Sequence, residues 1–239
     1  MSCDDDDCAL ALALLPYHAL PLTLMVHLCR CKLLDPSELI TMCHDVCSGM
    51  QYLESEGWIH GDLACRNVLV NANQVCQVAD FGLTVYQGLD IENNGRDESG
   101  KVTRTPSLKE KKTLYVKCIT PYAARWCPPE VIGIDHDGMA KRHFSHKSDV
   151  WAFGVTMYEI FTAAETPYSR VTDPLYTSKG LMRYSDVKRY VMDGLRLPRP
   201  VEIDISFFAR NILPCWDAKP SQRPTFCQLE AVIRGFLPK

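Results

Sequence analysis

The sequence predicts a mostly helical α+β domain with one small β element. Three observations lead to this class. Residues 39–53 repeat apolar side chains at helical spacing, and residues 149–162 are apolar almost all round. Two short β-like runs, Val68–Val70 and Val75–Val78, flank an Asn71-Ala72-Asn73 turn. No internal repeat is apparent.

The bulk properties are those of an ordinary soluble protein. The 239 residues suffice for one large or two small domains, with 46% hydrophobic and 23% charged residues. A net charge of -3 gives no electrostatic case for binding nucleic acid or an anionic membrane. The 12 cysteines include no C-x-x-C pair and no zinc spacing, which favours a reduced intracellular compartment. Cys43 and Cys47, one helical turn apart, are expected to pack as small hydrophobes.

The N-terminal residues are unusual. An acidic run, Asp4–Asp7, precedes an apolar stretch from Cys8 to Cys29. A secretory signal would place positive charge first, so this class is disfavoured. A membrane span fits the length, but prolines and histidines interrupt the stretch. We favour a disordered start over residues 1–20 followed by a buried strand.

The first long helix carries clear start and stop signals. Asp35 can cap its N-terminus, Pro36 suits the first turn, and Glu38 completes a capping box. Gly57 ends the helix. The residues expected on its buried face are Leu39, Cys43, Val46, Met50 and Leu53.

The rest of the chain alternates between polar and helical segments. Residues 90–112 are polar and charged, which predicts a solvated loop. Residues 149–162 form a buried helix, and helices are also expected over 183–192 and 205–216. A second capping box at Thr225-Phe226-Cys227-Gln228 opens the last helix.

One stretch places an Asp, an Arg and an Asn within six positions: His60-Gly61-Asp62-Leu63-Ala64-Cys65-Arg66-Asn67. Asp80-Phe81-Gly82 follows beyond the predicted hairpin. Any one of these residues alone is most simply a turn-forming Asp or Asn. As a set, they resemble the catalytic loop and the metal-binding loop of protein kinases, in the tyrosine kinase form.

The resemblance implies transfer of a phosphoryl group from ATP to a protein tyrosine. Such transfer needs an oriented hydroxyl, neutralised phosphate charge and bound magnesium. Asp62 is then the base that receives the hydroxyl proton, and Asn67 and Asp80 are oxygen ligands for magnesium. Arg66 stands four residues after Asp62, where tyrosine kinases place an Arg that orients the acceptor. Serine/threonine kinases commonly place a Lys two residues after the Asp.

Later segments extend the resemblance. Residues 125–130 are similar to the segment that closes the activation loop of tyrosine kinases, although Cys127 and Pro128 replace the usual Met and Ala. The resemblance implies that Asp149 holds the backbone of the catalytic loop. It also implies a buried ion pair between Glu130 and Arg223, which would anchor two distant segments.

Upstream, Pro21–Cys29 looks like the last small-lobe strand and the hinge of receptor tyrosine kinases. In that alignment Val26 is the gatekeeper. Leu28 and Cys29 would offer backbone hydrogen bonds to adenine, and Leu69 would pack beneath the adenine ring.

The family pattern is incomplete. The resemblance covers residues 21–237, as a hinge and large lobe with a long activation loop at 80–130. It includes no G-x-G-x-x-G loop and no Val-Ala-x-Lys strand. The segment between Cys29 and Asp35 is too short for the usual helix after the hinge. Gly61 stands where the family usually has the Arg that binds the phosphorylated activation loop.

The expected fold is therefore protein kinase-like α+β, mainly the helical C-terminal lobe, with a short β hairpin at the catalytic loop. The expected function is ATP- and magnesium-dependent phosphorylation of protein tyrosine by a fragment or truncated domain. The alternative is a catalytically inactive scaffold that binds a partner on the exposed small-lobe face. The expected location is the cytoplasm, or the cytoplasmic side of a membrane for a receptor. Tyr115 is a candidate for autophosphorylation or an ordinary loop tyrosine.

Overall fold

The computed structural model describes residues 22–31, 34–87, 123–132, 144–177 and 182–238. The predicted loop at 90–112, Tyr115 and residues 1–20 lie outside this described part. The first half contains β1 (Leu22–Thr23), α2 (Leu24–Arg30), α3 (Pro36–Ser55), β2 (Trp58–Ile59), the 3₁₀ turn η1 (Cys65–Asn67), β3 (Val68–Val70), β4 (Cys76–Val78), the 3₁₀ turn η2 (Phe81–Leu83) and β5 (Val85–Tyr86). The second half contains η4 (Ala123–Trp126), α4 (Pro129–Ile132), α5 (His146–Phe161), α6 (Tyr184–Met192), α7 (Ile205–Phe207), η5 (Phe208–Ile212), η6 (Leu213–Trp216), η7 (Pro220–Gln222) and α8 (Phe226–Arg234).

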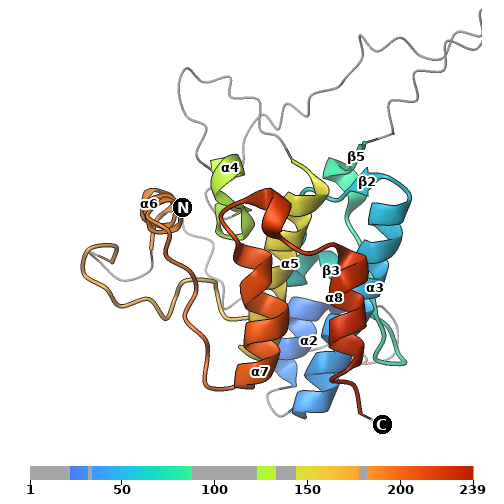
Figure 1. Cartoon of the computed structure of the whole chain (residues 1–239). Helices are drawn as coiled ribbons and strands as arrows, with labels where there is room; N and C mark the ends of the chain where they lie inside the picture. Colours follow the sequence, from blue (N-terminus) through green and yellow to red (C-terminus); the bar gives the residue numbers. More distant parts are fainter. Residues whose placement is uncertain (1–21, 32–33, 88–122, 133–143, 178–181, 239) are drawn as a thin grey trace, which may run out of the picture.

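Helix α5 forms the centre of the molecule, with α3 and α8 on one side and α7 in front (Figure 1). From Ser148 to Phe161 every residue of α5 is buried, as the apolar sequence predicts. Gly154 allows a close approach at its middle, because a Cβ there would lie 2.6 Å from the indole nitrogen of Trp216. The rings of Phe153 and Phe226 meet edge to face at 5.6 Å, which ties α5 to α8.

Helix α3 begins and ends where the sequence predicts. The Asp35 side chain accepts a hydrogen bond from the Ser37 amide at 2.8 Å, and Glu38 accepts one from the Asp35 amide at 2.8 Å. The helix ends at Ser55, just before Gly57. Cys43 and Cys47 are both buried in the core, so their predicted role as small hydrophobes is confirmed.

Two small sheets lie on either side of the catalytic-loop sequence, which connects β2 of one sheet to β3 of the other. The predicted hairpin is confirmed as β3 and β4, with Val68 opposite Val78 and Val70 opposite Cys76. Strand β1 pairs with the other edge of β3, which gives the order β1-β3-β4. Strands β2 and β5 form a separate antiparallel pair. Chain segments before and after the catalytic-loop sequence are thereby fixed on both sides.

The predicted helix over 205–216 is present but changes its hydrogen-bond pattern twice. Helix α7 continues into the π-helical turn η5 and then into the 3₁₀ turn η6. Pro214 has no N–H to continue an α-helical ladder, which accounts for the change in register just before it. The last predicted helix is α8, with the Thr225 capping box in place.

The prediction that Pro21–Cys29 forms a strand and hinge is wrong. Among the described residues of this segment, from Leu22 onward, only Leu22 and Thr23 are in a strand, and α2 begins immediately afterwards. The Thr23 hydroxyl accepts a hydrogen bond from the Val26 amide at 3.4 Å and caps the helix. Helical spacing then decides the structure, because Leu24, His27 and Leu28 point to one face and are buried there.

The consequences for Leu28 and Cys29 follow directly. Both lie in the last turn of α2, where their amide N–H groups serve the helix, so neither residue forms an extended hinge for adenine. Leu28 is a core residue, and the Cys29 thiol is exposed near the Ala163 carbonyl. The helix that precedes Asp35 lies upstream of the short segment from Cys29 to Asp35, within the residues expected to form the strand and hinge.

Candidate active site

The catalytic-loop sequence lies between β2 and β3, and the buried ring of His60 organises its start. The Asp62 amide donates to Nδ1 of His60 at 3.2 Å, and Nε2 of the ring lies 2.9 Å from the Ala79 carbonyl. This pattern requires the proton on Nε2. Burial lowers the pKa of His60, which keeps the ring neutral in this role.

Asp149, near the start of α5, binds the backbone of the same loop. Its carboxylate accepts hydrogen bonds from the His60 amide at 2.7 Å and the Gly61 amide at 3.0 Å. The role implied by the resemblance is thus confirmed for Asp149. Burial raises the pKa of this carboxyl to about 7, against the opposing effect of the two amides.

Gly61 adopts a backbone conformation suited to glycine. Its φ is +80°, and a Cβ would lie 3.3 Å from the Leu83 carbonyl oxygen. A residue with a side chain would be strained at this position in the observed conformation.

The structure brings Asp62, Arg66 and Asn67 together. The 3₁₀ turn η1 directs both later side chains back to Asp62. Arg66 donates from Nη2 to Asp62 Oδ1, and Asn67 donates from Nδ2 to Asp62 Oδ2 at 2.8 Å. A carboxylate has about four acceptor positions, so each oxygen keeps capacity for another donor.

Asp80 lies across the hairpin from this group. The Ala79 amide donates to the Asn67 carbonyl at 2.9 Å, which fixes the chain just before Asp80. Asp80 is exposed, has φ +59°, and accepts a hydrogen bond from the Gly82 amide at 3.4 Å. Within the described residues, the side-chain oxygen of Asn67 accepts no hydrogen bond, so Asn67 and Asp80 both present free oxygen atoms suited to a hard cation.

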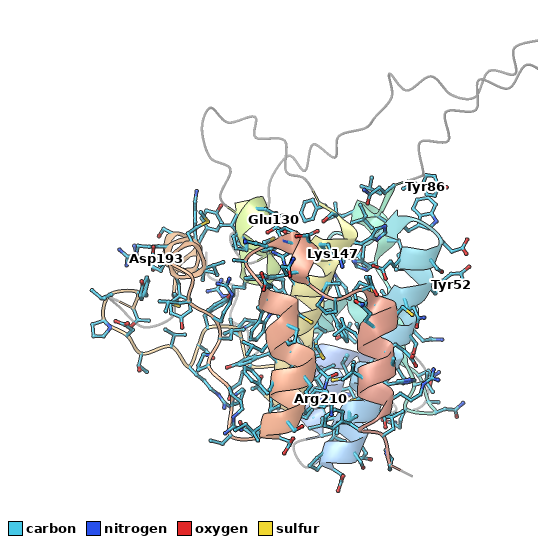
Figure 2. All side chains as sticks on the ribbon, viewed as in Figure 1. Tyr52, Tyr86, Glu130, Lys147, Asp193 and Arg210 are labelled. Carbon is cyan, nitrogen blue, oxygen red and sulfur yellow. The ribbon has the colours of Figure 1, made fainter. Side chains whose placement is uncertain are left out.

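The ion pair between Glu130 and Arg223 is confirmed. Arg223 donates from Nη1 and Nη2 to the two Glu130 oxygens at 2.7 and 2.8 Å. Lys147 lies beside this pair and donates to the Arg223 carbonyl at 2.7 Å. Glu130 and Lys147 lie near one another at the upper end of the molecule in Figure 2. The segment after the activation loop is thereby tied to the chain just before α8.

A model of the family described as protein tyrosine and serine/threonine kinase matches residues 8–233. The chain belongs to the protein kinase family. Its mostly helical α+β structure is the kinase-like fold that the sequence predicts, mainly the helical lobe. The family generally uses ATP and Mg²⁺ and phosphorylates protein substrates.

Relatives of this kinase are tyrosine kinases. The chain is 33% identical to human tyrosine-protein kinase TXK over 80% of its own length, and 36% identical to human cytoplasmic tyrosine-protein kinase BMX over 84%. It is 32% identical to human ephrin type-A receptor 1 over 85% of its length. The matched region spans only 28%, 24% and 17% of these three relatives, respectively. Within the described residues of this kinase, no helix is long and apolar enough to cross a membrane.

Two residues of this kinase near Arg66 were missed by the sequence analysis. Glu159 on α5 and Trp126 at the end of η4 share a hydrogen bond in the core. A signal was present, because Glu159 is an acidic residue in an otherwise apolar helical run. A buried carboxylate in such a run needs polar partners, and these come from distant parts of the chain.

Proposed function

We propose that this chain carries the large-lobe part of a tyrosine kinase active site, which transfers the γ-phosphoryl group of ATP to a protein tyrosine. The cluster of Asp62, Arg66 and Asn67 is the observation that carries the proposal. Asp62 receives the proton of the tyrosine hydroxyl as its oxygen bonds to the γ-phosphorus and the bond to ADP breaks. Arg66 orients Asp62 and the acceptor.

Asn67 and Asp80 are the proposed magnesium ligands. Their free side-chain oxygens, one neutral and one anionic, fit the preference of this ion for oxygen donors. Magnesium, when bound, neutralises phosphate charge. Leu69 on β3, half-buried opposite Thr23, is the proposed apolar contact for adenine.

We further propose that part of the nucleotide site comes from a small lobe. The 239 residues contain no G-x-G-x-x-G and no Val-Ala-x-Lys. In domain terms, residues 21–237 are the proposed partial kinase domain, with a long activation loop at 80–130. Because the proposed substrate is intracellular ATP, we place the chain in the cytoplasm or on the cytoplasmic face of a membrane.

The test of this function is phosphotransfer from Mg·ATP to a tyrosine peptide. Asp62→Asn keeps the size of the side chain and removes the base, so we expect a loss of about 10²-fold or more. Asp173→Asn is the matched control, since Asp173 is exposed and caps only its own turn. Transfer that is equally fast with Asp62→Asn would rule out this assignment.

A second candidate is a non-catalytic binding module, and one surface favours it. An open cavity of about 420 Å³ lies between α3 and β4, and Phe81 at its edge is 51% exposed. Tyr52 at the same cavity is 66% exposed, and Figure 2 shows Tyr52 and Tyr86 extending outward on this side. Exposed apolar groups in one region mark a site for a partner or a small lobe.

Calorimetric titration with Mg·ATP separates the two candidates. A heat of binding that Asp80→Asn weakens supports the kinase. A folded monomer that gives no heat supports the binding module instead.

A further inference from the structure

Glu159 is a buried carboxylate that the proposed chemistry does not use. It is 3% exposed, on a helix whose other residues from Ser148 onward are mostly apolar and buried. Its Oε2 accepts two hydrogen bonds, from the Cys65 amide at 3.1 Å and from the Trp126 indole N–H at 2.8 Å. One oxygen atom therefore joins the catalytic loop to the end of η4, which is far away in sequence.

Both donors to Glu159 contact or adjoin Arg66. Cys65 is its neighbour in the chain. The Trp126 ring lies against the guanidinium group, with Arg66 Cζ 4.6 Å from the ring centroid, a distance at which cation–π attraction operates. Arg66 in turn donates to Asp62. A continuous set of contacts thus runs from Glu159 through Trp126 and Arg66 to the proposed base.

Burying the carboxylate of Glu159 costs free energy, because the charged form loses its contact with water. Burial raises the pKa of Glu159 to about 7, although Trp126, Cys65 and the nearby charge of Arg66 act in the opposite direction. A leucine or methionine would fill the same space without the desolvation cost. Local rules broken in this way are expected where a position serves the site.

We propose that Glu159 is a positioning residue for the acceptor tyrosine. It fixes the Trp126 ring and the Cys65 peptide, which together hold Arg66 beside Asp62 where the tyrosine hydroxyl must arrive. The proposal rests on the proposed function, because it concerns recognition of the same acceptor. The new element is that recognition of the tyrosine hydroxyl depends on the Glu159 carboxylate, although Glu159 does not contact the hydroxyl.

The first experiment follows the indole N–H resonances of the ¹⁵N-tryptophan-labelled chain. Trp126→Phe assigns the relevant signal, and Trp151 and Trp216, whose indole nitrogens have no partner in the described part of the chain, serve as internal references. We expect Glu159→Ala to speed hydrogen exchange at Trp126 about tenfold or more, because the buried indole N–H loses its hydrogen-bond acceptor. Glu159→Gln retains an acceptor oxygen and should preserve the signal.

Two further variants complete this experiment. Arg66→Ala should move the Trp126 resonance, since the cation leaves the face of the ring. Glu230→Ala removes another buried carboxylate, one on α8 that pairs with His44 and Arg234, and should leave the Trp126 signal in place. A Trp126 signal that Glu159→Ala does not change would overturn the positioning link, whatever the chain does catalytically.

The second experiment measures acceptor recognition by fluorescence anisotropy. Two labelled peptides differ only in having Tyr or Phe at the acceptor position, and the ratio of their dissociation constants reports recognition of the hydroxyl. We expect the wild type and Glu159→Gln to prefer Tyr roughly tenfold, and Glu159→Ala to lose that preference. Glu230→Ala should retain it, although it also lowers stability.

A double variant shows whether Glu159 acts through Arg66. If it does, Arg66→Ala alone abolishes the Tyr preference, and adding Glu159→Ala weakens binding of neither peptide further. Losses that multiply would overturn the proposal. A wild type with no Tyr preference would contradict the proposed acceptor site, while the indole signals would still decide whether Glu159 holds Trp126.

Discussion

Three carboxyl groups near the catalytic loop show how environment assigns different tasks to one functional group. Asp62 is half-buried and faces the side chains of Arg66 and Asn67. Asp149 and Glu159 are buried; Asp149 binds two backbone amides of the same loop, and Glu159 binds one. The half-buried Asp62 remains accessible, as the proposed role of base requires. The two buried groups fix the loop that carries it.

The pH dependence of stability tests the buried state of Glu159. Its pKa in the folded chain, about 7, is above the ordinary value of 4.5, so the folded state binds this proton more tightly. The resulting stabilisation is complete below about pH 4.5 and is lost as pH rises through 7. The wild type should therefore lose about 3 kcal/mol relative to Glu159→Gln across this window.

Urea unfolding of both proteins at several pH values measures this difference. Using the difference removes the contributions of His60 and Asp149, which both proteins share. A constant difference between pH 5 and 8 would contradict the buried, raised-pKa state of Glu159.

At the scale of elements, helix ends were easier to predict from sequence than helix surroundings. The capping boxes at Asp35 and Thr225 use residues three positions apart, so the signal is local, and both are confirmed. The prediction of a strand and hinge over Pro21–Cys29 is wrong because a nearly continuous apolar run does not by itself distinguish a strand from a buried helix. The Thr23 cap and the spacing of Leu24, His27 and Leu28 decide for a helix instead.

The candidate site likewise contains residues that local sequence spacing predicts and contacts that it does not. Asp62, Arg66 and Asn67 lie within one short loop, so their spacing alone indicates that they can meet. The contacts of Glu159 with Cys65 and Trp126 join residues far apart in the chain. No periodicity or spacing reports such a contact. Leu28 and Cys29 were predicted to form a hinge, and this prediction is wrong because both belong to α2.

The packing of α5 gives a prediction with an unusual sign. Replacing a helical glycine by alanine ordinarily stabilises a helix by up to about 1 kcal/mol. In Gly154→Ala the new methyl would lie 2.6 Å from the Trp216 indole nitrogen and 2.9 Å from the Cys215 Cβ. We expect a loss of about 1–3 kcal/mol in the free energy of unfolding, measured by urea denaturation. A stabilised variant would show that η6 is not packed tightly on α5.

The N-terminal cap of α3 gives a smaller effect. Asp35→Ala removes the acceptor for the Ser37 amide, while Pro36 and Glu38 remain. The expected loss in unfolding free energy is about 1 kcal/mol, measured by thermal or urea unfolding. Asp35→Asn keeps an acceptor oxygen and should recover most of it. Equal losses for both variants would argue against capping as the cause.

At the scale of the whole molecule, a few polar contacts hold distant segments in one arrangement. Asp149 joins α5 to the catalytic loop, and Glu130 joins the end of the activation loop to Arg223. His44 on α3 and Glu230 on α8 are joined at 2.9 Å. The first of these contacts fixes the loop that carries the proposed base, and the His60 ring of that loop meets the exposed Phe81 ring edge to face at 5.7 Å.

Breaking the ion pair of Glu130 should have a large effect. Arg223 is 2% exposed, so Glu130→Ala leaves a buried charge without its carboxylate. We expect a loss of roughly 3–5 kcal/mol in the free energy of unfolding. Glu165→Ala is the control, because its pair with Arg170 is solvent-exposed and should contribute under about 1 kcal/mol. Similar losses for both variants would contradict a special role for the buried pair.

The central claim is that the loop from His60 to Asn67, with Asp80, forms a working part of a tyrosine kinase site. The most direct measurement compares phosphate transfer from Mg·ATP to two peptides that differ only in having Tyr or Ser as the acceptor. The account predicts phosphotyrosine at a rate that Asp62→Asn lowers by about 10²-fold or more, with little phosphoserine. Equal phosphorylation of both peptides, or transfer that Asp62→Asn leaves unchanged, would contradict it.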